Sequence, residues 1–261
     1  MALMVSVLGS GSRGNATFIK TDSVRILIDA GLSCKELAKR LESIGEDPEG
    51  IDVVLVTHEH NDHGAGLRTL LKELSVRAYL TPGTLRGLQP ETFEMNGSEL
   101  HLITAGVPFT VGDAEIMPFA VPHDANEPTA FSIACQGMRI TQLTDAGHMS
   151  EAVATHLMGA DCLILESNHD LEMLRVGPYP WVLKQRLMGR YGHLSNSAVA
   201  RFIREQYDGK ASQLVLAHLS EKNNHPEIAR QEALRALRHR GLASTVTTTR
   251  QQEPTAPIRL C

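Results

Sequence analysis

The residues best able to do chemistry stand close together, in the segment THEHNDHG that follows the apolar run IDVVLV. Imidazole and carboxylate groups are the ligands that zinc, manganese and iron prefer in proteins. A loop that leaves a strand can direct several such groups into one small volume. A metal ion then offsets the repulsion and desolvation of the crowded side chains. The candidate ligands in this loop are His58, His60, Asp62 and His63.

Three further ligand types follow other apolar runs. His123 follows EIMPFAV, Asp145 follows RITQLT, and His218 follows LVLA. Residues after the carboxyl ends of strands collect in one crevice of α/β folds. Seven ligands are too many for one tetrahedral ion and suit two ions that share a bridging ligand. The sequence therefore predicts two divalent ions per chain, with zinc, manganese and iron all open.

The elements that must position these ligands alternate along the chain. Apolar, β-branched runs predict strands over residues 4–8, 16–20, 24–29, 51–56, 77–80, 101–103, 115–121, 130–134, 138–143, 162–166 and 213–217. Helical spacing predicts helices over residues 35–44, 66–74, 150–157, 180–188, 196–207 and 226–240. Ser195 is expected to cap one helix that Gly209 closes, and Pro226 to begin another that ends at Gly241.

This order of elements predicts an α/β fold. Two sheets covered by helices, in a four-layer arrangement within one domain, account for it. The domain is expected to span residues 1–245. Residues 246–261, rich in Thr, Gln and Pro, are expected to be a tail that is either frayed or a late edge strand.

Composition excludes several classes of protein. The 261 residues are 42% hydrophobic and 21% charged, as in globular proteins, and the net charge of −5 excludes a generally basic nucleic-acid coat protein. A local basic groove stays compatible with that charge. Four cysteines without a CxxC pair exclude a disulfide scaffold and a cysteine zinc knuckle. With no long apolar run and no basic leader, the sequence predicts a cytoplasmic protein without a membrane partner.

Two other segments could contact an anion. The loop GSGSRGN could offer backbone N–H groups and the hydroxyls of Ser10 and Ser12 to a phosphate, or it could simply connect two strands. His193 stands at the expected start of a helix, where exposed N–H groups favour an anion. The alternative for His193 is a helix-capping role without substrate contact.

Aromatic and basic residues leave two readings open. Tyr179 and Trp181 could stack on a base or pack in the core. One set of basic residues could border a strand-binding groove or lie on a solvated face: Arg175, Lys184, Arg186, Arg190, Arg201 and Arg204. A second set is interpreted as solvated: Arg230, Arg235, Arg238 and Arg240.

The HxHxDH pattern, with a distant His, Asp and His after it, resembles the metallo-β-lactamase superfamily, a four-layer αββα sandwich with a dinuclear metal site. The resemblance implies that His58, His60 and His123 hold one ion. Asp62, His63 and His218 would hold the other, and Asp145 would bridge. The segment LIDAG resembles the early Asp motif of the superfamily, which implies that Asp29 orients a ligand imidazole.

The runs LGSGSRGN, ESNHDLEMLRVG and HLSEKNN resemble a narrower group, the small YycJ-like (WalJ-like) proteins regarded as 5′-to-3′ exonucleases of DNA. The resemblance implies a metal-dependent phosphodiesterase acting on single-stranded DNA or DNA ends, with zinc or manganese as cofactor and iron as an alternative. Asp62 and Asp145 would orient a metal-bridging hydroxide, and His193 would assist the leaving group. Glu166 would be a structural acid. The implied substrate-binding residues are Ser10, Ser12, Asn15, His169, Asn196, Lys222 and Asn224.

Other functions suit the same scaffold. A phosphodiesterase of small cyclic or nucleotide diesters would differ only in the length of its groove. A thioester or lactone hydrolase would need an apolar acyl pocket. A metal-stabilised binding module would need neither His193 nor an open coordination site. The short stretches between His123, Asp145 and His218 leave no room for the accessory RNA-binding parts of RNA-processing relatives.

Overall fold

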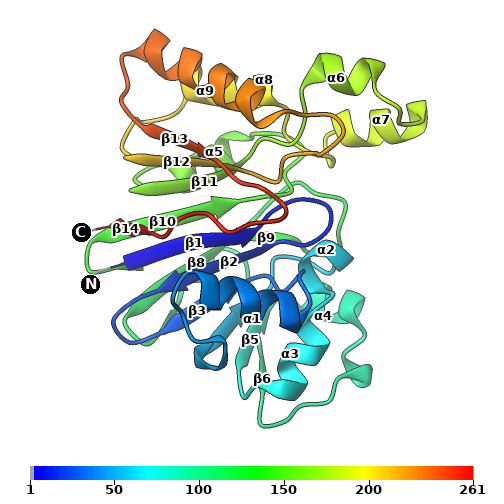
Figure 1. The fold of residues 1–261 in the computed structure, drawn as a ribbon, viewed down its shortest axis with the longest axis vertical. Coiled ribbons are helices and arrows are strands. Elements are labelled where there is room, and N and C mark those ends of the chain that lie inside the picture. Colours follow the sequence, from blue (N-terminus) through cyan, green and yellow to red (C-terminus); the bar gives the residue numbers. More distant parts are fainter. Residues whose placement is uncertain (1–2, 261) are drawn as a thin grey trace. The chain divides into compact units, whose positions relative to one another are not determined.

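A computed structural model describes residues 3–260 (Figure 1). Met1, Ala2 and Cys261 lie outside the described residues. The start of the predicted domain and the last residue of the predicted tail, which is the fourth cysteine, therefore also lie outside them. The chain divides into two compact units. The first comprises Met1–Ala120, Ala125–Met138 and Arg250–Cys261, and the second comprises Val121–Asp124 and Arg139–Thr249.

The first unit is built on a mixed seven-stranded sheet with the order β14-β1-β2-β3-β4-β5-β6. Strands β14 to β3 in this order pair antiparallel, and β3 to β6 pair parallel. The strands are β1 (Leu3–Gly9), β2 (Ala16–Lys20), β3 (Arg25–Ile28), β4 (Val53–Leu55), β5 (Arg77–Leu80), β6 (Glu99–Leu102) and β14 (Ile258–Leu260). Strand β14 lies in the predicted tail and pairs with β1, so this part of the tail is an edge strand.

Two helices cover one face of this sheet with an apolar stripe. They are α1 (Cys34–Ser43) and α3 (Leu67–Glu73), and both lie along the sheet in Figure 1. Leu37 and Leu41, one turn apart on α1, join a core cluster with Phe18 and Leu27 of the sheet. The side chain of Ser33 accepts a hydrogen bond from the Glu36 N–H and so fixes the start of α1.

The first unit also holds short helices and an antiparallel run of strands. The helices are α2 (Asn61–Gly64), α4 (Pro82–Leu88), η1 (Pro48–Gly50) and η2 (Pro90–Thr92). The strands are β7 (Phe109–Val111), β8 (Ala114–Ala120) and β9 (Thr129–Cys135), which pair antiparallel in that order. They belong to a second seven-stranded sheet.

The second unit centres on four parallel strands, β10 (Met138–Leu143), β11 (Cys162–Glu166), β12 (Gln213–Ala217) and β13 (Thr245–Thr248). Parallel strands are covered on both faces, and β11 is accordingly buried along its whole length. The helices are α5 (Glu151–Leu157), α6 (Leu171–Val176), α7 (Trp181–Met188), α8 (Asn196–Glu205) and α9 (Pro226–Arg240). Helix α8 buries Val199, Phe202 and Ile203 along one stripe.

The longer predicted elements are confirmed, and two details are corrected. Ser195 caps α8 as predicted, but α8 ends at Glu205, four residues before Gly209, with Gln206 as its cap. Arg240 is not simply solvated, because its Nη1 donates to the carbonyls of Ile203, Arg204 and Tyr207 beyond the end of α8. The division of the chain at residue 245 stays a prediction.

No helix in the part of the chain from residue 3 to residue 260 combines the length and apolar character needed to cross a membrane.

Candidate metal centre

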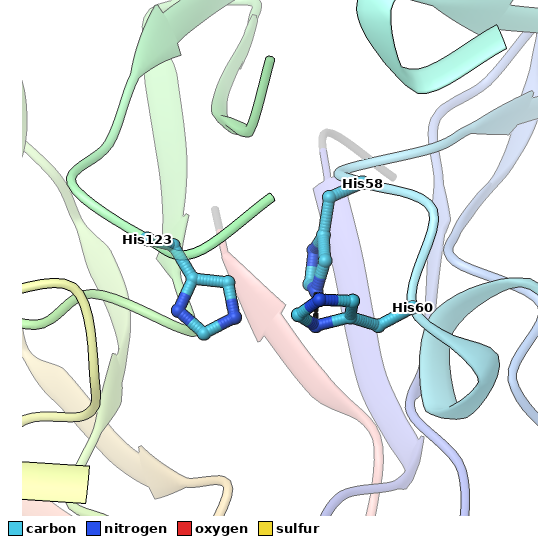
Figure 2. Close-up of side chains that lie close together, drawn as sticks. All are labelled: His58, His60 and His123. Carbon is cyan, nitrogen blue, oxygen red and sulfur yellow. Dashed lines mark hydrogen bonds between the residues drawn. The ribbon is translucent and has the colours of Figure 1, made fainter. Parts of the chain in front are cut away.

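The loop after β4 brings its histidines together. The rings of His58 and His60 meet edge to face, with 4.6 Å between centroids and 3.1 Å between His58 Nε2 and His60 Nδ1 (Figure 2). The His63 ring lies 4.1 Å from that of His58. Helix α2 begins directly after His60, and its single turn turns Asp62 and His63 back toward the same loop. Three imidazoles and a carboxylate therefore share one small volume of the first unit.

Asp29 fixes the orientation of His63. The carboxylate is fully buried, and its Oδ2 lies 2.7 Å from His63 Nδ1. Because a carboxylate only accepts, His63 donates from Nδ1, and its Nε2 is the accepting nitrogen. Thr57 completes this arrangement, since its N–H and its hydroxyl both donate to Asp29. The contact fits the predicted role of Asp29. The role of Thr57 was missed, although it stands directly before the histidine motif.

The glycine-rich loop closes around the other side of the same segment. The Asn15 N–H donates to the carbonyl of Asp62 at 2.7 Å, and its side-chain Nδ2 lies 3.0 Å from His63 Nε2. Asn15 is buried, and its Oδ1 accepts from the Gly11 N–H. Of the two predicted phosphate-binding serines, Ser10 is buried and Ser12 is exposed. Only Ser12 therefore presents its side chain to solvent.

Gly31 is required where the glycine-rich loop meets the loop of residues 57–63. A Cβ on Gly31 would stand 1.8 Å from the carbonyl oxygen of Asp62 and 2.7 Å from the backbone nitrogen of Asn15. Only a residue without a side chain allows the three backbone segments to approach so closely.

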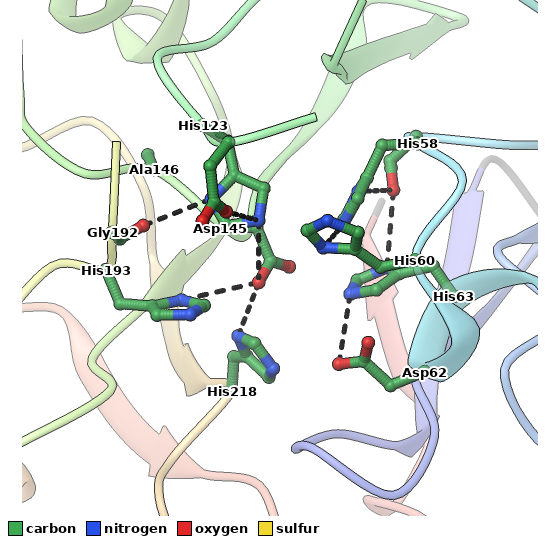
Figure 3. Close-up of polar contacts among 12 residues, drawn as sticks. His58, His60, Asp62, His63, His123, Asp145, Ala146, Gly192, His193 and His218 are labelled. Carbon is green, nitrogen blue, oxygen red and sulfur yellow. Dashed lines mark hydrogen bonds and ion pairs between the residues drawn. The ribbon is translucent and has the colours of Figure 1, made fainter. Parts of the chain in front are cut away.

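The second unit gathers its own donors at the ends of β10, β11 and β12. Asp145, Glu166, His193 and His218 each offer a ligand atom, and these atoms lie within 4.8 Å of one another. Asp145 Oδ1 lies 3.0 Å from His218 Nδ1 and 3.4 Å from His193 Nδ1 (Figure 3). His123 Nε2 lies 4.0 Å from the same carboxylate oxygen. Three of the predicted ligands thus meet in this unit.

Glu166 is the fixed point of this cluster. It is fully buried, and its Oε1 lies 2.7 Å from His193 Nδ1 and 3.1 Å from His218 Nδ1. Its Oε2 accepts from the N–H groups of Ala146 and Leu194. Burial would raise the pKa of Glu166, but His193 and His218 lower the pKa to about 2. One anion therefore holds both histidines and the two loops beside them.

Three candidate ligating or orienting residues share an unusual backbone. Asp29, Asp145 and His218 follow β3, β10 and β12 and have φ values of 62°, 56° and 53°. Non-glycine residues seldom adopt this left-handed conformation, and Asp and His are among the types that tolerate it best. The left-handed residue stands just beyond each strand, where the chain no longer follows the regular in-and-out alternation of side chains in the sheet.

A known family matches this chain. The family described as "Beta-lactamase superfamily domain" matches residues 24–219, three quarters of the sequence. The chain belongs to the β-lactamase superfamily. Its mixed sheets with flanking helices are the metallo-β-lactamase fold, as predicted.

Curated relatives within the β-lactamase superfamily cover most of the chain. It is 35% identical over 226 residues to "Exodeoxyribonuclease WalJ" of Streptococcus pneumoniae, a match that covers 86% of this chain and 84% of that protein. It is 34% identical to "Exodeoxyribonuclease YycJ" of Bacillus anthracis, covering 92% and 91% of the two chains. Among solved structures, the metallo-β-lactamase fold protein YhfI from Bacillus subtilis superimposes with a TM-score of 0.74 at 19% identity, covering 97% of this chain and 99% of YhfI.

The donors of this β-lactamase superfamily member suit a divalent metal. His and Asp side chains are buried or half-buried in both units, and imidazole with carboxylate is the donor set for zinc, manganese or iron. His63 and His218 each donate from Nδ1 to a buried carboxylate, which makes Nε2 the nitrogen that carries the lone pair a metal requires.

The remaining predicted substrate residues differ in what they offer. Asn196 and Asn224 are buried and bond to each other, and Asn224 also donates to the carbonyls of Ser167 and Asn168. His169 is buried and its Nδ1 has no hydrogen-bond partner among the described residues. Lys222 is exposed, with its Nζ 5.6 Å from the centre of the Tyr179 ring.

Several residues of the first basic set are already paired or buried. Lys184 is buried, and its Nζ donates to the carbonyls of Arg175 and Gly177 at 2.8 Å, so it holds the turn between α6 and α7. Arg186 pairs with Asp124 at 2.6 Å, and Arg175 pairs with Glu172. Trp181 does not pack in the core, since 60% of its surface is exposed.

Proposed function

We propose that this protein is a metal-dependent phosphodiesterase that degrades DNA from a 5′ end. The observation that carries the proposal is the cluster of Asp145, His193 and His218 around the buried anion Glu166. The superfamily membership and the relatives named as exodeoxyribonucleases support it. Single-stranded DNA or DNA ends are the proposed substrate. The cytoplasm is the proposed location, supported by the three free cysteines among the described residues.

We propose two metal ions, zinc or manganese, held by the seven ligands. His58, His60 and His123 would hold one ion, Asp62, His63 and His218 the other, and Asp145 both. The contact of His58 with His60, the contact of Asp145 with His218 and the fixed tautomer of His63 each support part of this assignment. Two such ions, when bound, supply Lewis acidity toward the phosphoryl oxygens and lower the pKa of water.

His193 is the proposed general acid. Its Nδ1 donates to Glu166, so its Nε2 can hold a proton for the oxygen that leaves phosphorus. The side chain is 16% exposed, which leaves it reachable by a substrate. Asp62 and Asp145 would hold and orient the attacking water through their carboxylates.

The substrate-binding residues divide into two groups in this proposal. Ser12, Lys222 and His169 would contact DNA, supported by the exposure of Ser12 and Lys222 and the buried Nδ1 of His169 without a hydrogen-bond partner among the described residues. The others would hold the loops in place, supported by their burial: Ser10, Asn15, Asn196 and Asn224.

Hydrolysis of DNA by manganese-loaded protein tests the proposal. A 5′-phosphorylated, 3′-labelled single strand, bis-p-nitrophenyl phosphate and a thioester are compared, with Asp145→Asn as the inactive control. We expect stepwise shortening from the 5′ end that the variant lacks. Cleavage of the small diester alone would replace the proposal by a small-molecule phosphodiesterase. Thioester turnover with intact DNA would overturn the phosphodiesterase assignment.

A further inference from the structure

The exposed apolar side chains of the protein gather on one helical hairpin, α6–α7, which spans residues 171–191. Ten large apolar side chains are exposed in the described part of the chain, and six belong to this hairpin. They are Leu171, Val176, Trp181, Val182, Met188 and Tyr191. Trp181 and Met188, seven residues apart, share one face of α7, and Val182 is exposed beside Trp181, so this side of the helix is turned to solvent rather than to the core.

The hairpin is also basic and aromatic. It contains four basic residues and one acidic residue, although the whole chain is acidic. Three of the five Tyr and Trp residues of the chain lie within residues 179–191. Arg190 and the neighbouring Lys222 form no ion pair among the described residues, and Lys222 stands over the ring of Tyr179. Exposed aromatic rings beside unpaired cations are the composition of surfaces that bind single-stranded nucleic acid.

The two ends of the hairpin are fixed at the candidate site. The segment leaves the site after His169 and returns to it at His193. The Asn168 N–H donates to the Leu194 carbonyl at 2.8 Å, and the Asn196 N–H donates to the His169 carbonyl at 2.9 Å, so the base is closed. The buried ammonium of Lys184 fixes the turn between the two helices. The hairpin is therefore held in place at both its base and its turn.

We propose that the α6–α7 hairpin binds single-stranded DNA, with bases stacked on Trp181 and Tyr191 and phosphates held by Arg190 and Lys222. This inference rests on the proposed function and names the surface that would hold the strand. A second copy of the chain is disfavoured as the occupant. In a two-fold contact the same basic residues would face one another, and the apolar residues are interrupted by charges that interface cores lack.

Trp181 is the single tryptophan of the chain, so it reports directly on the hairpin. In metal-free protein, which cannot cleave, titration with an oligothymidylate of about 12 nucleotides should quench Trp181 fluorescence saturably. The quenching should weaken as salt increases, because phosphate contacts release counterions. Quenching that depends on protein concentration and not on DNA would overturn the proposal in favour of self-association.

Variants measured by anisotropy of a labelled oligothymidylate complete the test. Trp181→Ala, Tyr191→Ala and Arg190→Ala should each raise the Kd roughly tenfold, and Trp181→Phe should restore most of the affinity. The matched controls Ile228→Ala and Arg238→Ala, on exposed positions of α9 in the same unit, should bind as the unaltered protein does. An unchanged Kd in Trp181→Ala would overturn the proposal.

Binding without metal separates this inference from the proposed function. If the protein cleaves DNA but Trp181→Ala leaves the Kd for oligothymidylate unchanged, the proposed role of the hairpin is overturned and the proposed nuclease activity stands. Tight binding lost in Trp181→Ala, in a protein that cleaves no DNA when loaded with manganese, would support the hairpin and overturn the nuclease.

Discussion

At the scale of single residues, the site depends on anions that orient imidazoles. Asp29 fixes His63 in the first unit, and Glu166 fixes both His193 and His218 in the second. Each carboxylate is fully buried and fully occupied by donors. Such residues act through the ligands that they hold, and their replacement changes the site without removing a ligand.

Glu166→Gln should lower metal affinity or DNA hydrolysis roughly 10–100-fold, because an amide cannot accept from two imidazoles and two backbone N–H groups at once. Metal content by mass spectrometry and the hydrolysis rate measure the effect. Glu227→Gln, at an exposed position of α9, is the control. Equal metal content and equal rate in both variants would contradict a positioning role for Glu166.

Gly31→Ala should disrupt the loop of residues 57–63, because the new Cβ would stand 1.8 Å from the Asp62 carbonyl oxygen. We expect a loss of about 1–3 kcal/mol in the free energy of unfolding, and weaker metal binding. Gly45→Ala is the control, since Gly45 has a φ of 80° and no heavy atom within 4 Å of the added Cβ. It should lose stability only, so metal affinity measured by titration distinguishes the two. A metal affinity of Gly31→Ala equal to that of Gly45→Ala would be evidence against the steric account.

At the scale of elements, the C-terminal segment supports the glycine-rich loop. Gln251 is buried, accepts from the Arg13 N–H and donates to the Gly14 carbonyl. Arg40 of α1 donates to the carbonyls of Leu8 and Gln251. The segment that ends in β14 therefore holds the loop that in turn holds Asp62 through Asn15.

Gln251→Ala should cost about 1–3 kcal/mol in the free energy of unfolding, because it removes the buried hydrogen bond to the Gly14 carbonyl and the part-buried one from the Arg13 N–H. Thermal unfolding measures the loss. The exposed neighbour Gln252, changed to Ala, should unfold close to the temperature of the unaltered protein. If the two variants unfolded at the same temperature, the stability of the glycine-rich loop would not depend on Gln251.

The elements that the sequence predicts well are those with local signals. The bounds of α9 follow from Pro226 and Gly241, and β5, β11 and β12 follow from short apolar runs with polar borders. The missed helices α2 and α6 have four and six residues, too few for a periodic pattern, and in α4 one proline and two glycines obscure the helical signal. The ligand types follow the strands and are visible in the sequence. The supporting contacts of Thr57, Arg40 and Gln251 join distant segments, and local patterns carry no trace of them.

At the scale of the whole molecule, metal binding and stability are linked. Each unit carries a cluster of buried or half-buried His and Asp side chains whose crowding a bound ion would relieve. A ligand at 100 times its Kd stabilises the folded state by about 2.7 kcal/mol. The same contribution is lost when a chelator removes the metal.

Addition of a chelator to metal-loaded protein should therefore lower Tm by about 5–10 °C, given about 2–4 °C per kcal/mol for a chain of this size. Differential scanning calorimetry with and without chelator measures the change. Asp145→Asn should show a smaller shift, because Asp145 is the proposed shared ligand. A Tm indifferent to chelator in the unaltered protein would contradict metal binding in the folded state.

The left-handed backbones of Asp29, Asp145 and His218 also limit how this gene can change after duplication. Asparagine is the other side chain that tolerates this conformation well, and the codons of Asp and His become Asn codons by a change of the first base alone. One mutation at any of these positions thus removes an acid or an imidazole and keeps the turn. We therefore expect copies of this gene that lose catalysis but keep the fold to carry asparagine at these positions, where other replacements would disturb the backbone as well.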